Sequence, residues 1–537
     1  MAKVALVATL TKPLSSDLHE LRQLPEGVTH LQVRADLAGD IPAGHLRSHF
    51  SGELLYTLRS RICGGTFEGS ELERQRRIVS VGADYGLVEL EADSDLSPRL
   101  LAAVPAGARM ISWRGTEGHA DLETVFKAIA VTPARYYCLR TSASKTSDGL
   151  QPLLLLRKLG RKDVIAYSER PPGCWTQLLA PHFGSPLVFG HVDANTTPKG
   201  ELTIYQLVQD YGFPALHPVR ELYGIVGNSI FKSPSPRLHN TGYRALGYPA
   251  LFLPFHVECF EDFWREMIEA PALESIGLSI QGLTIVSPHK EAALAAADAL
   301  SSMVDKAGSS NVFVRRDDQW EAHTTDPESV SRIKENCSNG SGCRAAVIGC
   351  GGAGRAVAAA LQQAGAEVTL VNRGKERGHY AVRLLGLPFV LLSEFEARHF
   401  TLLVNATPVG RDGDSLPFGI DSVGNGTVVV DLAYGTHPTP LVSGVLARGG
   451  SIVDGHDVLL TQVRKQFYMM IGQELPSSIG REIVVSSAAW DASQASNSAV
   501  VCQPQMSPRN AAECENGNRL FSSTATSGLA AARTGGS

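Results

Sequence analysis

The chain has 537 residues, of which 43% are hydrophobic and 19% charged, and its formal net charge is −5. This length predicts about three to four domains, and the small net charge gives no indication of binding to nucleic acid or to anionic membranes. No apolar run approaches the ~18 residues of a membrane-spanning helix. The nine cysteines form no Cys-x-x-Cys pair, so we expect neither a zinc site nor a disulfide framework, and a reducing cytoplasm fits best.

Short apolar segments alternate with helical patterns over residues 1–215. Eight strands with intervening helices are the pattern of a (β/α)8 barrel. The expected strands are Val4–Leu10, His30–Val33, Leu54–Leu58, Gly86–Glu91, Ala108–Ser112, Tyr136–Leu139, Asp163–Ala166 and Leu187–Gly190. Barrel sites lie at the carboxyl ends of the strands, where the polar residues are Arg34, Arg59, Glu89, Arg114 and Ser168.

This half resembles the type I 3-dehydroquinate dehydratases. The matching segments are Leu31–Asp36, Thr57–Arg59 followed by Gly64-Gly65, Val88–Leu90 and Phe183–Leu187. The resemblance implies a lysine on the sixth strand that forms a Schiff base, and a histidine on the fifth strand that acts as acid and base. At those positions this chain has Cys138 and Arg114. Arg34, Arg59 and Glu89 do match polar positions of the family.

A Schiff base needs an amine, which neither a thiol nor a guanidinium supplies. We therefore expect a barrel that has kept its fold and lost the lysine-dependent reaction. It would bind an acidic ligand through Arg34, Arg59 and Arg114, or simply support its neighbour. The alternative is that Lys145, about five residues beyond the strand, reaches inward as a substitute.

A second αβ unit begins after the boundary near Tyr211–Pro218. A strand at Leu222–Val226 leads into a loop where prolines flank Ser233 and Ser235, ahead of a helix expected from Arg237. Small hydroxyl groups here suit hydrogen bonds to a polyol or a carboxylate. Ser235 is equally suited to capping that helix.

Lys290 follows the expected strand Gly282–Ser287 and would open a helix over Glu291–Leu300. Open αβ sheets bind ligands at this end of a strand, and the helix dipole disfavours a cation there, so the lysine calls for a reason. Asp326 can cap a helix beginning at Pro327 or direct its carboxylate at Lys290.

A glycine-rich turn joins the strand Ala345–Ile348 to the helix Ala356–Leu361, and a second strand follows at Val368–Val371. This is the first half of a dinucleotide-binding fold, whose glycines admit a pyrophosphate. The residues of the turn are Gly349, Gly351, Gly352, Ala353 and Gly354. NAD-binding chains tend to place an acid about 20 residues on; here Asn372, Arg373 and Lys375 stand there, which favours the 2′-phosphate of NADP.

Further parallel strands are expected at Thr401–Ala406, Thr427–Leu432 and Ser451–Val453, and a last helix at Asp457–Gly472. The tail is rich in Ser, Ala, Asn and Gly, which predicts disorder. The predicted organisation is a barrel (1–215), a substrate-binding domain (220–330), a Rossmann NADP domain (340–455), a C-terminal helix that packs back on the substrate domain (456–480) and a disordered tail (484–537).

The second half resembles the shikimate dehydrogenase family over residues 222–475. The matching blocks are Ser233–Asn240, Pro288–Glu291, Gly308–Asn311, Thr324–Asp326, Gly349–Gly354, Val404–Gly410, Asp431–Tyr434, Thr439–Leu441 and Gly455–Gln462. The resemblance implies Lys290 and Asp326 as the catalytic pair, and Thr407 as a further cofactor contact. It also implies a set of substrate-binding residues: Ser233, Ser235, Asn311, Tyr434 and Gln462.

The whole chain resembles the fused dehydratase–dehydrogenases of the shikimate pathway. The activity this implies is the reversible, NADP-dependent reduction of 3-dehydroshikimate, with small molecules as ligands and no metal. Three alternatives stay open: a barrel that also dehydrates 3-dehydroquinate, quinate as the substrate, and a ligand-sensing protein without activity. The sequence does not give the oligomeric state.

Overall fold

The computed structural model describes residues 2–15, 19–115, 121–270, 273–331, 333, 342–424, 426–435 and 437–484. The predicted disordered tail lies, beyond Val484, outside these residues. Within them, no helix combines the length and the apolar character needed to cross a bilayer.

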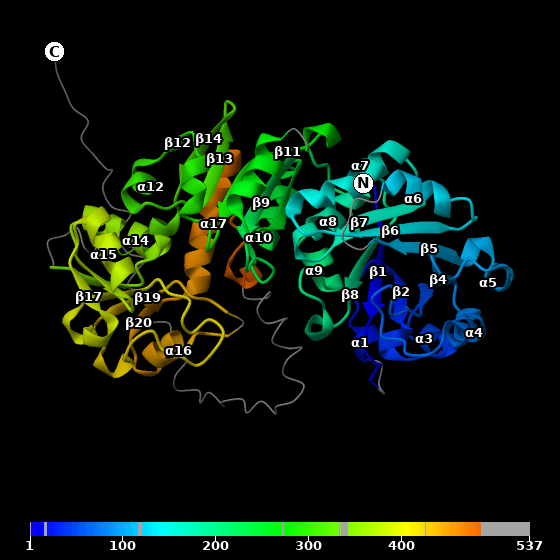
Figure 1. Ribbon diagram of the computed structural model, residues 1–537. Coiled ribbons are helices and arrows are strands. Elements are labelled where there is room, and N and C mark those ends of the chain that lie inside the picture. The colour runs from blue at the N-terminus through cyan, green and yellow to red at the C-terminus, as the bar shows by residue number, and fades with distance from the viewer. Residues whose placement is uncertain are drawn as a thin grey trace, which may run out of the picture. The chain divides into compact units, whose positions relative to one another are not determined.

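The first part of the chain forms an eight-stranded parallel sheet of the predicted barrel type, drawn blue to blue-green in Figure 1. The hydrogen-bonded order is β7-β6-β5-β4-β3-β2-β1-β8, so that β1 pairs with both β2 and β8. Among the described strands, β7 and β8 stand at the two ends of this order and are not hydrogen-bonded to each other. The strands are β1 (Ala5–Leu10), β2 (Val28–Arg34), β3 (Glu53–Thr57), β4 (Leu87–Glu91), β5 (Arg109–Arg114), β6 (Tyr136–Ser142), β7 (Val164–Glu169) and β8 (Leu187–His191). The predicted fold of this half is confirmed.

Helices follow the strands and cover the outside of the barrel. Two of them begin at side-chain caps: the Ser70 hydroxyl accepts the amide of Glu73 before α4, and Thr203 forms a capping box with Gln206 before α9. The helices are α1 (His19–Arg22), α2 (Ala35–Ala38), α3 (Ala43–Arg47), α4 (Glu71–Gly82), α5 (Pro98–Ala103), α6 (Leu122–Ile129), α7 (Leu150–Leu159), α8 (Trp175–Leu179) and α9 (Ile204–Gln209). Strands β4 and β8 are buried along their whole length, as expected where helices cover one face and side chains fill the lumen.

The predicted substrate-binding domain is a mixed six-stranded sheet with the order β10-β9-β11-β13-β14-β12. Its strands are β9 (Glu221–Gly227), β10 (Ala250–His256), β11 (Ser279–Ile285), β12 (Ala299–Leu300), β13 (Val312–Arg316) and β14 (Gln319–His323). Its helices are α10 (Ser235–Leu246), α11 (Phe260–Phe263), which continues as a π-helix over Trp264–Glu269, and α12 (Ser302–Ala307). Its core is continuous with that of the barrel: the rings of Trp175 and Phe255 lie 5.7 Å apart.

Three local predictions in this domain are wrong. The helix expected at Glu291–Leu300 is a turn, then a 3-10 helix (Ala292–Ala296) and the edge strand β12, because Ala297 returns to extended backbone and the next residue bonds to Trp320. The helix expected from Arg237 begins two residues earlier. A 3-10 helix over Asp326–Val330 replaces the one expected from Pro327.

The predicted dinucleotide-binding domain is a parallel sheet with the order β17-β16-β15-β18-β19-β20. Its strands are β15 (Arg344–Ile348), β16 (Glu367–Asn372), β17 (Phe389–Leu391), β18 (Leu402–Asn405), β19 (Val428–Asp431) and β20 (Ser451–Val453), and its helices are α14 (Gly352–Gln363), α15 (Lys375–Leu385) and α16 (Pro440–Ala447). The last helix, α17 (Gly455–Ile471), packs Val463, Phe467 and Met470 into the core of the substrate-binding domain, and Figure 1 shows it in orange alongside the green strands.

Candidate functional site

Lys290 and Asp326 form an ion pair at one edge of the substrate-binding sheet. The Lys290 Nζ lies 2.8 Å from Oδ2 and 3.1 Å from Oδ1 of Asp326. Lys290 follows β11 and Asp326 follows β14; each of these strands is antiparallel to β13, so both run the same way and end at the same edge. The side chain of Lys290 is 18% exposed and that of Asp326 only 4%. Asp326 was expected either to cap a helix or to direct its carboxylate at Lys290, and in the structure it contacts Lys290.

Two amide side chains also hold the carboxylate of Asp326. The Nδ2 of Asn311 donates to Oδ1 at 3.1 Å, and the Nε2 of Gln462 donates to the same oxygen at 3.2 Å. The Oδ1 of Asn311 accepts the backbone amide of Thr325 at 2.8 Å, which holds its side chain in place. The lysine, aspartate, asparagine and glutamine are thus brought together, although residues 290 and 462 lie far apart in the sequence.

A second layer behind these residues is absent from the sequence prediction. Gln466, one turn after Gln462 on α17, donates to the Thr325 hydroxyl at 3.1 Å and accepts from the Thr284 hydroxyl at 3.2 Å. All three side chains are buried. The helical spacing of Gln462 and Gln466 is the signal that could have indicated this role, because residues four apart share a helix face.

Ser233, Ser235 and Tyr434 form a hydroxyl-bearing group. Ser233 donates to the Ser235 hydroxyl at 3.1 Å and accepts the Ser235 backbone amide at 3.3 Å. It is therefore Ser233 that satisfies an amide of the first turn of α10, while Ser235 lies inside the helix and caps nothing. Ser233 and Tyr434 both line a cavity of about 740 Å³. Burial raises the pKa of Tyr434, so its phenol remains a proton-bearing donor.

The glycine-rich turn opens α14 with free backbone amides. Gly349 has a φ of +106°, and a side chain at Gly354 would lie 1.8 Å from the carbonyl oxygen of Gly349, so both positions require glycine. Gly351 is the N-cap, receives no side-chain hydrogen bond and has open space where a side chain would stand. Gly352 and Ala353 provide the first turn. These features fit the pyrophosphate of a dinucleotide.

The end of β16 is cationic. The Oδ1 of Asn372 accepts the Cys350 amide at 3.2 Å, and its Nδ2 donates to the Gly374 carbonyl at 2.8 Å, so this side chain holds the turn together. Arg373 and Lys375 beside it are exposed. Thr407 packs against the turn, since a side chain at Gly349 would meet its methyl group at 2.8 Å. The residues present therefore fit a 2′-phosphate better than a free ribose hydroxyl.

Arg355 joins the glycine-rich turn to the substrate-binding domain and was not predicted. It is completely buried on α14. Its guanidinium donates to the Cys350 carbonyl at 3.1 Å, to the Ala307 carbonyl at 2.7 Å and to the Gly308 carbonyl at 3.1 Å. In the sequence it stands at the start of an apolar helix, a position where an arginine is expected to be exposed to solvent.

Of the predicted barrel residues, Arg34, Arg59 and Ser168 line a cavity of about 320 Å³ at the carboxyl ends of the strands, and Glu89 and Arg114 are not among its lining residues. Arg34 is engaged by the carboxylate of Asp36 at 2.7 and 2.8 Å. Arg114 donates to Glu89 at 3.0 Å. Burial would raise the pKa of Glu89, but the guanidinium groups of Arg114 and Arg59 lower it well below its usual value. Burial and the neighbouring arginines lower the pKa of Arg59 to about 9.

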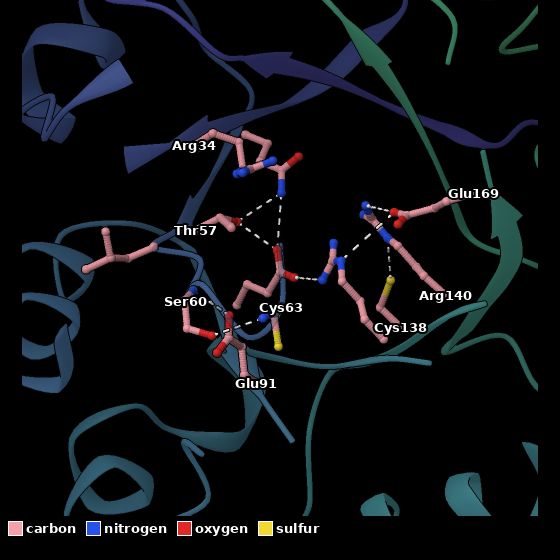
Figure 2. A network of polar contacts seen from close by, with 12 residues as sticks. Arg34, Thr57, Ser60, Cys63, Glu91, Cys138, Arg140 and Glu169 are labelled. Atoms are coloured by element: carbon pink, nitrogen blue, oxygen red, sulfur yellow. Dashed lines mark hydrogen bonds and ion pairs between the residues drawn. The ribbon is translucent and has the colours of Figure 1, made fainter. Parts of the chain in front are cut away.

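A further arginine, Arg140, lies in the lumen and was missed. Figure 2 shows it between Glu169 and Cys138: its Nη1 lies 3.0 Å from the Glu169 carboxylate and its Nε lies 3.4 Å from the Cys138 sulfur. Cys138 and Arg140 are two residues apart on β6 and so face the same side. Alternation along the expected strand could have revealed Arg140, but the predicted strand ended at Leu139.

The alternative that Lys145 replaces the lost amine is not supported. Its ammonium group lies 2.6 Å from the carboxylate of Glu266, and the side chain is 56% exposed. Lys145 is not among the residues that line the cavity, and among the described lining residues none is a lysine. Gln177, which does line it, donates to the Phe189 carbonyl at 2.6 Å.

The cysteines follow the prediction only in part. Those that are free are Cys63, Cys138, Cys174, Cys259 and Cys350. Cys343 is disulfide-bonded, which the prediction missed because it considered only Cys-x-x-Cys spacing. No cluster of His, Cys, Asp and Glu side chains suited to a metal occurs in the part of the chain that the structure describes.

Comparisons with known families divide the chain as the fold does. The family described as type I 3-dehydroquinase matches residues 5–216, and the shikimate dehydrogenase substrate binding domain matches residues 225–313. A third family, ketopantoate reductase, matches residues 345–398, the first part of the dinucleotide-binding domain.

Individual relatives match the dehydrogenase half or nearly the whole chain. A bifunctional 3-dehydroquinate dehydratase/shikimate dehydrogenase, chloroplastic, from Arabidopsis thaliana is 26% identical over 504 residues, which are 88% of this chain and 81% of that protein. A shikimate dehydrogenase (NADP(+)) from Oleidesulfovibrio alaskensis is 30% identical over 276 residues, which are 50% of this chain and 96% of that protein.

Among solved structures, shikimate 5-dehydrogenase from Thermus thermophilus in complex with NADP(H) and shikimate is 27% identical, with a TM-score of 0.44; the match covers 50% of this chain and 99% of that one. The dehydrogenases from Oleidesulfovibrio alaskensis and Thermus thermophilus are matched over nearly their full length. In this chain the matched region follows the dehydroquinase domain. The chain belongs to the shikimate dehydrogenase family and carries a type I 3-dehydroquinase domain ahead of it.

Proposed function

We propose that this chain catalyses the reversible, NADP-dependent reduction of 3-dehydroshikimate to shikimate. One observation carries the proposal: the acid–base pair lies against the cofactor turn. A side chain placed on Gly352 would come within 3.6 Å of the Cβ of Lys290, and the Ser309 hydroxyl donates to the Gly352 carbonyl at 3.1 Å. A ring held by Lys290 is therefore beside the turn that would hold the dinucleotide.

Lys290 is the proton donor in the direction of reduction and the acceptor in reverse. Bound NADPH supplies the hydride. As the carbonyl oxygen at C3 gains charge, the Lys290 ammonium is placed to donate a proton to it, and Asp326 holds that ammonium in position. General acid–base assistance of this kind contributes typically ~10²–10⁴ in rate.

The remaining site residues bind the ring. Ser233, Ser235 and the protonated Tyr434 supply hydroxyl groups for the substrate carboxylate. Gln462 uses one amide hydrogen on Asp326, and the rest of its amide can take a ring hydroxyl. Asn311 is held by Asp326 and Thr325 and would contact a ring hydroxyl beside them. Their fixed positions orient the substrate before reaction, which lowers the entropic part of the barrier.

The cofactor assignment rests on charge at the end of β16. Asn372, an amide where NAD-binding chains tend to place an acid, is engaged in holding the turn, while Arg373 and Lys375 offer two exposed cations to a 2′-phosphate. The pyrophosphate would lie on the amides from Gly351 to Gly354, with Thr407 beside Gly349.

We further propose that the barrel does not carry the imine chemistry of its family. Cys138 and Arg114 stand at the amine and imidazole positions, and Lys145 pairs with Glu266. A fully bifunctional enzyme is the second candidate, favoured by the match of the Arabidopsis enzyme over 88% of this chain.

A single assay separates these proposals. The full chain is purified from a host that lacks its own dehydroquinate dehydratase and shikimate dehydrogenase, and NADPH loss is followed with either 3-dehydroshikimate or 3-dehydroquinate. Consumption with 3-dehydroshikimate alone is the expected result. Consumption with both supports the bifunctional enzyme, and consumption with neither contradicts the proposed dehydrogenase. Shikimate and quinate are then compared in the oxidation direction to test the quinate alternative.

We also propose the domain limits predicted from the sequence, a cytoplasmic location, and ligands that are small molecules only. Limited proteolysis with mass spectrometry tests the limits, fractionation of cells that express the tagged chain tests the location, and light scattering gives the oligomeric state.

A further inference from the structure

Ser233 and Tyr434 share their cavity with an arginine from the dinucleotide-binding domain. Arg411 lies in the loop that follows β18 and lines the same cavity of about 740 Å³ as those two residues. Its guanidinium carbon lies 5.5 Å from the centre of the Tyr434 ring, which is within the reach of a cation–π contact. A cation therefore lies beside the hydroxyl groups that we propose for the substrate carboxylate.

The half-buried side chain of Arg411 has no anionic partner in the part of the chain that the structure describes. It forms neither an ion pair nor a side-chain hydrogen bond with a described residue. Asp412 and Asp414 also line the cavity, but both are exposed and neither pairs with Arg411. The remaining acid of the described lining, Asp210, lies 2.5 Å from the guanidinium of Arg237. The donors of Arg411 are thus available to a ligand.

The loop that carries Arg411 is fixed at both ends. At its start, the Thr407 hydroxyl donates to Oδ1 of Asn405 at 2.7 Å. Further on, the Arg411 amide donates to the Pro408 carbonyl at 3.2 Å. The end packs against the neighbouring chain, since a side chain on Gly435 would lie 2.6 Å from the carbonyl oxygen of Arg411. These contacts involve the backbone of residue 411, so a change of its side chain leaves the loop in place.

The same loop lies between the cofactor turn and the substrate cavity. Thr407 packs beside Gly349 of the glycine-rich turn, and Arg411 lines the cavity. Ser233, by contrast, belongs to the substrate-binding domain. A ligand that meets both Ser233 and Arg411 therefore connects the two domains.

Arg411 adds charge to a group of neutral donors. Burial raises the pKa of Tyr434, and the positive charge of Arg411 acts in the opposite direction, so this charge reaches the phenol. Hydroxyl groups such as those of Ser233 and Tyr434 can donate to a carboxylate or to a neutral ester. A guanidinium adds the opposite charge and a planar pair of donors that matches the two oxygens of a carboxylate. It is the group that distinguishes the acid from the ester.

We propose that Arg411 is a specificity-determining residue of the dehydrogenase, which binds the substrate carboxylate from the side of the dinucleotide-binding domain. The inference rests on the proposed function, because it names the side chain that recognises the acid group of that substrate. The carboxylate is then held by hydroxyl groups of the cavity on one side and by a guanidinium on the other. The enzyme thereby selects ring acids over their neutral esters.

The test compares shikimate with its methyl ester as substrates for oxidation by NADP⁺. In Arg411→Gln, kcat/KM for shikimate should fall about tenfold to a hundredfold, as expected for loss of a charge-assisted contact. The fall should come from KM, which is the sign of a binding contact, and the value for the ester should change by less than about threefold. Arg411→Lys keeps a charge without the planar pair of donors and should recover part of the preference for the acid.

Matched controls separate this contact from a structural role. Arg411→Gln leaves no described carboxylate without a partner, so its melting temperature should stay that of the unmodified chain. Arg398→Gln removes an exposed arginine of the same domain that pairs with Glu396 and should keep the full preference for shikimate. Lys232→Gln removes an exposed cation of the cavity lining and should keep it as well.

Equal losses for the acid and the ester in Arg411→Gln would overturn the inference, because that pattern reports a general disturbance of the site. So would a loss of preference in Lys232→Gln alone. If the unmodified chain oxidises neither compound, the proposed function fails, and calorimetric titration with shikimate tests Arg411 separately. Equal affinity of the unmodified chain and Arg411→Gln for shikimate would then overturn the role of Arg411, as would the absence of binding to both.

Discussion

The guanidinium of Arg355 lies 3.0 Å from the carboxylate of Glu291. Arg355 belongs to the first helix of the dinucleotide-binding domain, and Glu291 directly follows Lys290 in the turn of the substrate-binding domain. The same arginine also donates to the carbonyls of Ala307 and Gly308. One buried side chain therefore ties the glycine-rich turn to the segment that carries Lys290.

Replacing Arg355 by Gln should lower kcat/KM by about tenfold or more, since a small displacement of a positioned group is costly. It should also destabilise the protein by about 1–3 kcal/mol per carbonyl left unpaired. Denaturant unfolding and steady-state kinetics measure the two effects. Arg377→Gln is the control: it removes another partner of Glu291, at 3.2 Å, but an exposed one. Equal behaviour of the two variants would contradict the positioning role.

Lys290→Met should lower kcat by about 10²–10⁴, the usual contribution of general acid–base catalysis. Binding of NADPH, followed by fluorescence titration, should persist because the glycine-rich turn is intact. Asp326→Asn keeps the shape of the side chain and should give a smaller loss. Lys158→Met, an exposed barrel lysine that pairs with Glu123, should have no effect. Turnover of Lys290→Met within a factor of about three of the unmodified chain would exclude the proposed proton transfer.

Removing the two cations at the end of β16 should change cofactor preference. In Arg373→Ala/Lys375→Ala, kcat/KM for NADPH should fall about tenfold to a hundredfold, in line with loss of charge-assisted contacts to a phosphate, while the value for NADH stays the same. Arg383→Ala, an exposed position on the same helix α15, is the control. A parallel fall with both cofactors would mean that these residues support the fold and not the 2′-phosphate.

His239 should make the protein sensitive to acid. It is completely buried between aromatic rings, stacked on Phe252 at 4.1 Å, and burial lowers its pKa to about 3. Between its ordinary pKa of about 6.5 and that value the unfolded chain binds a proton that the folded chain does not, so stability falls as the pH falls through this window. The loss is about 2 kcal/mol at pH 5.

The measurement is the melting temperature at pH 7.5 and pH 5 for the unmodified chain and for His239→Gln. The substitution should lower stability at pH 7.5 but reduce the further drop at pH 5. His379→Gln, on the exposed side of α15, should retain the full drop. If His239→Gln loses as much stability on acidification as the unmodified chain, another group is responsible.

The strands of the barrel could be predicted to within a few residues, because strands buried on both faces read as apolar runs. The structure of the stretch after Lys290 could not be predicted. Its alanines favour a helix locally, but Ala299 and Leu300 pair with β14 and form a strand instead. The hairpin between β13 and β14 was also missed, although Asp317 and Asp318 take the positive φ angles that a tight hairpin turn requires.

The candidate sites show the same limit. Lys290 and Asp326 could be paired from the sequence because both belong to blocks that match the shikimate dehydrogenase family, although the strand that precedes Asp326 was not predicted. Arg140 was missed because the predicted strand ended one residue before it, and Arg355 could not be placed because its role depends on acceptors in another domain. A buried arginine is indistinguishable in sequence from a surface one until its acceptors are known.

In the dehydrogenase half, the backbone connects the substrate-binding and dinucleotide-binding domains twice. The backbone passes from the substrate-binding domain to the dinucleotide-binding domain after residue 331 and returns through α17, whose Val463, Phe467 and Met470 lie in the first core. Two lobes joined at two points cannot rotate freely about a single linker. We expect any movement between the lobes to be of the hinge type, and to carry Gln462, on the returning helix α17, with the substrate-binding lobe.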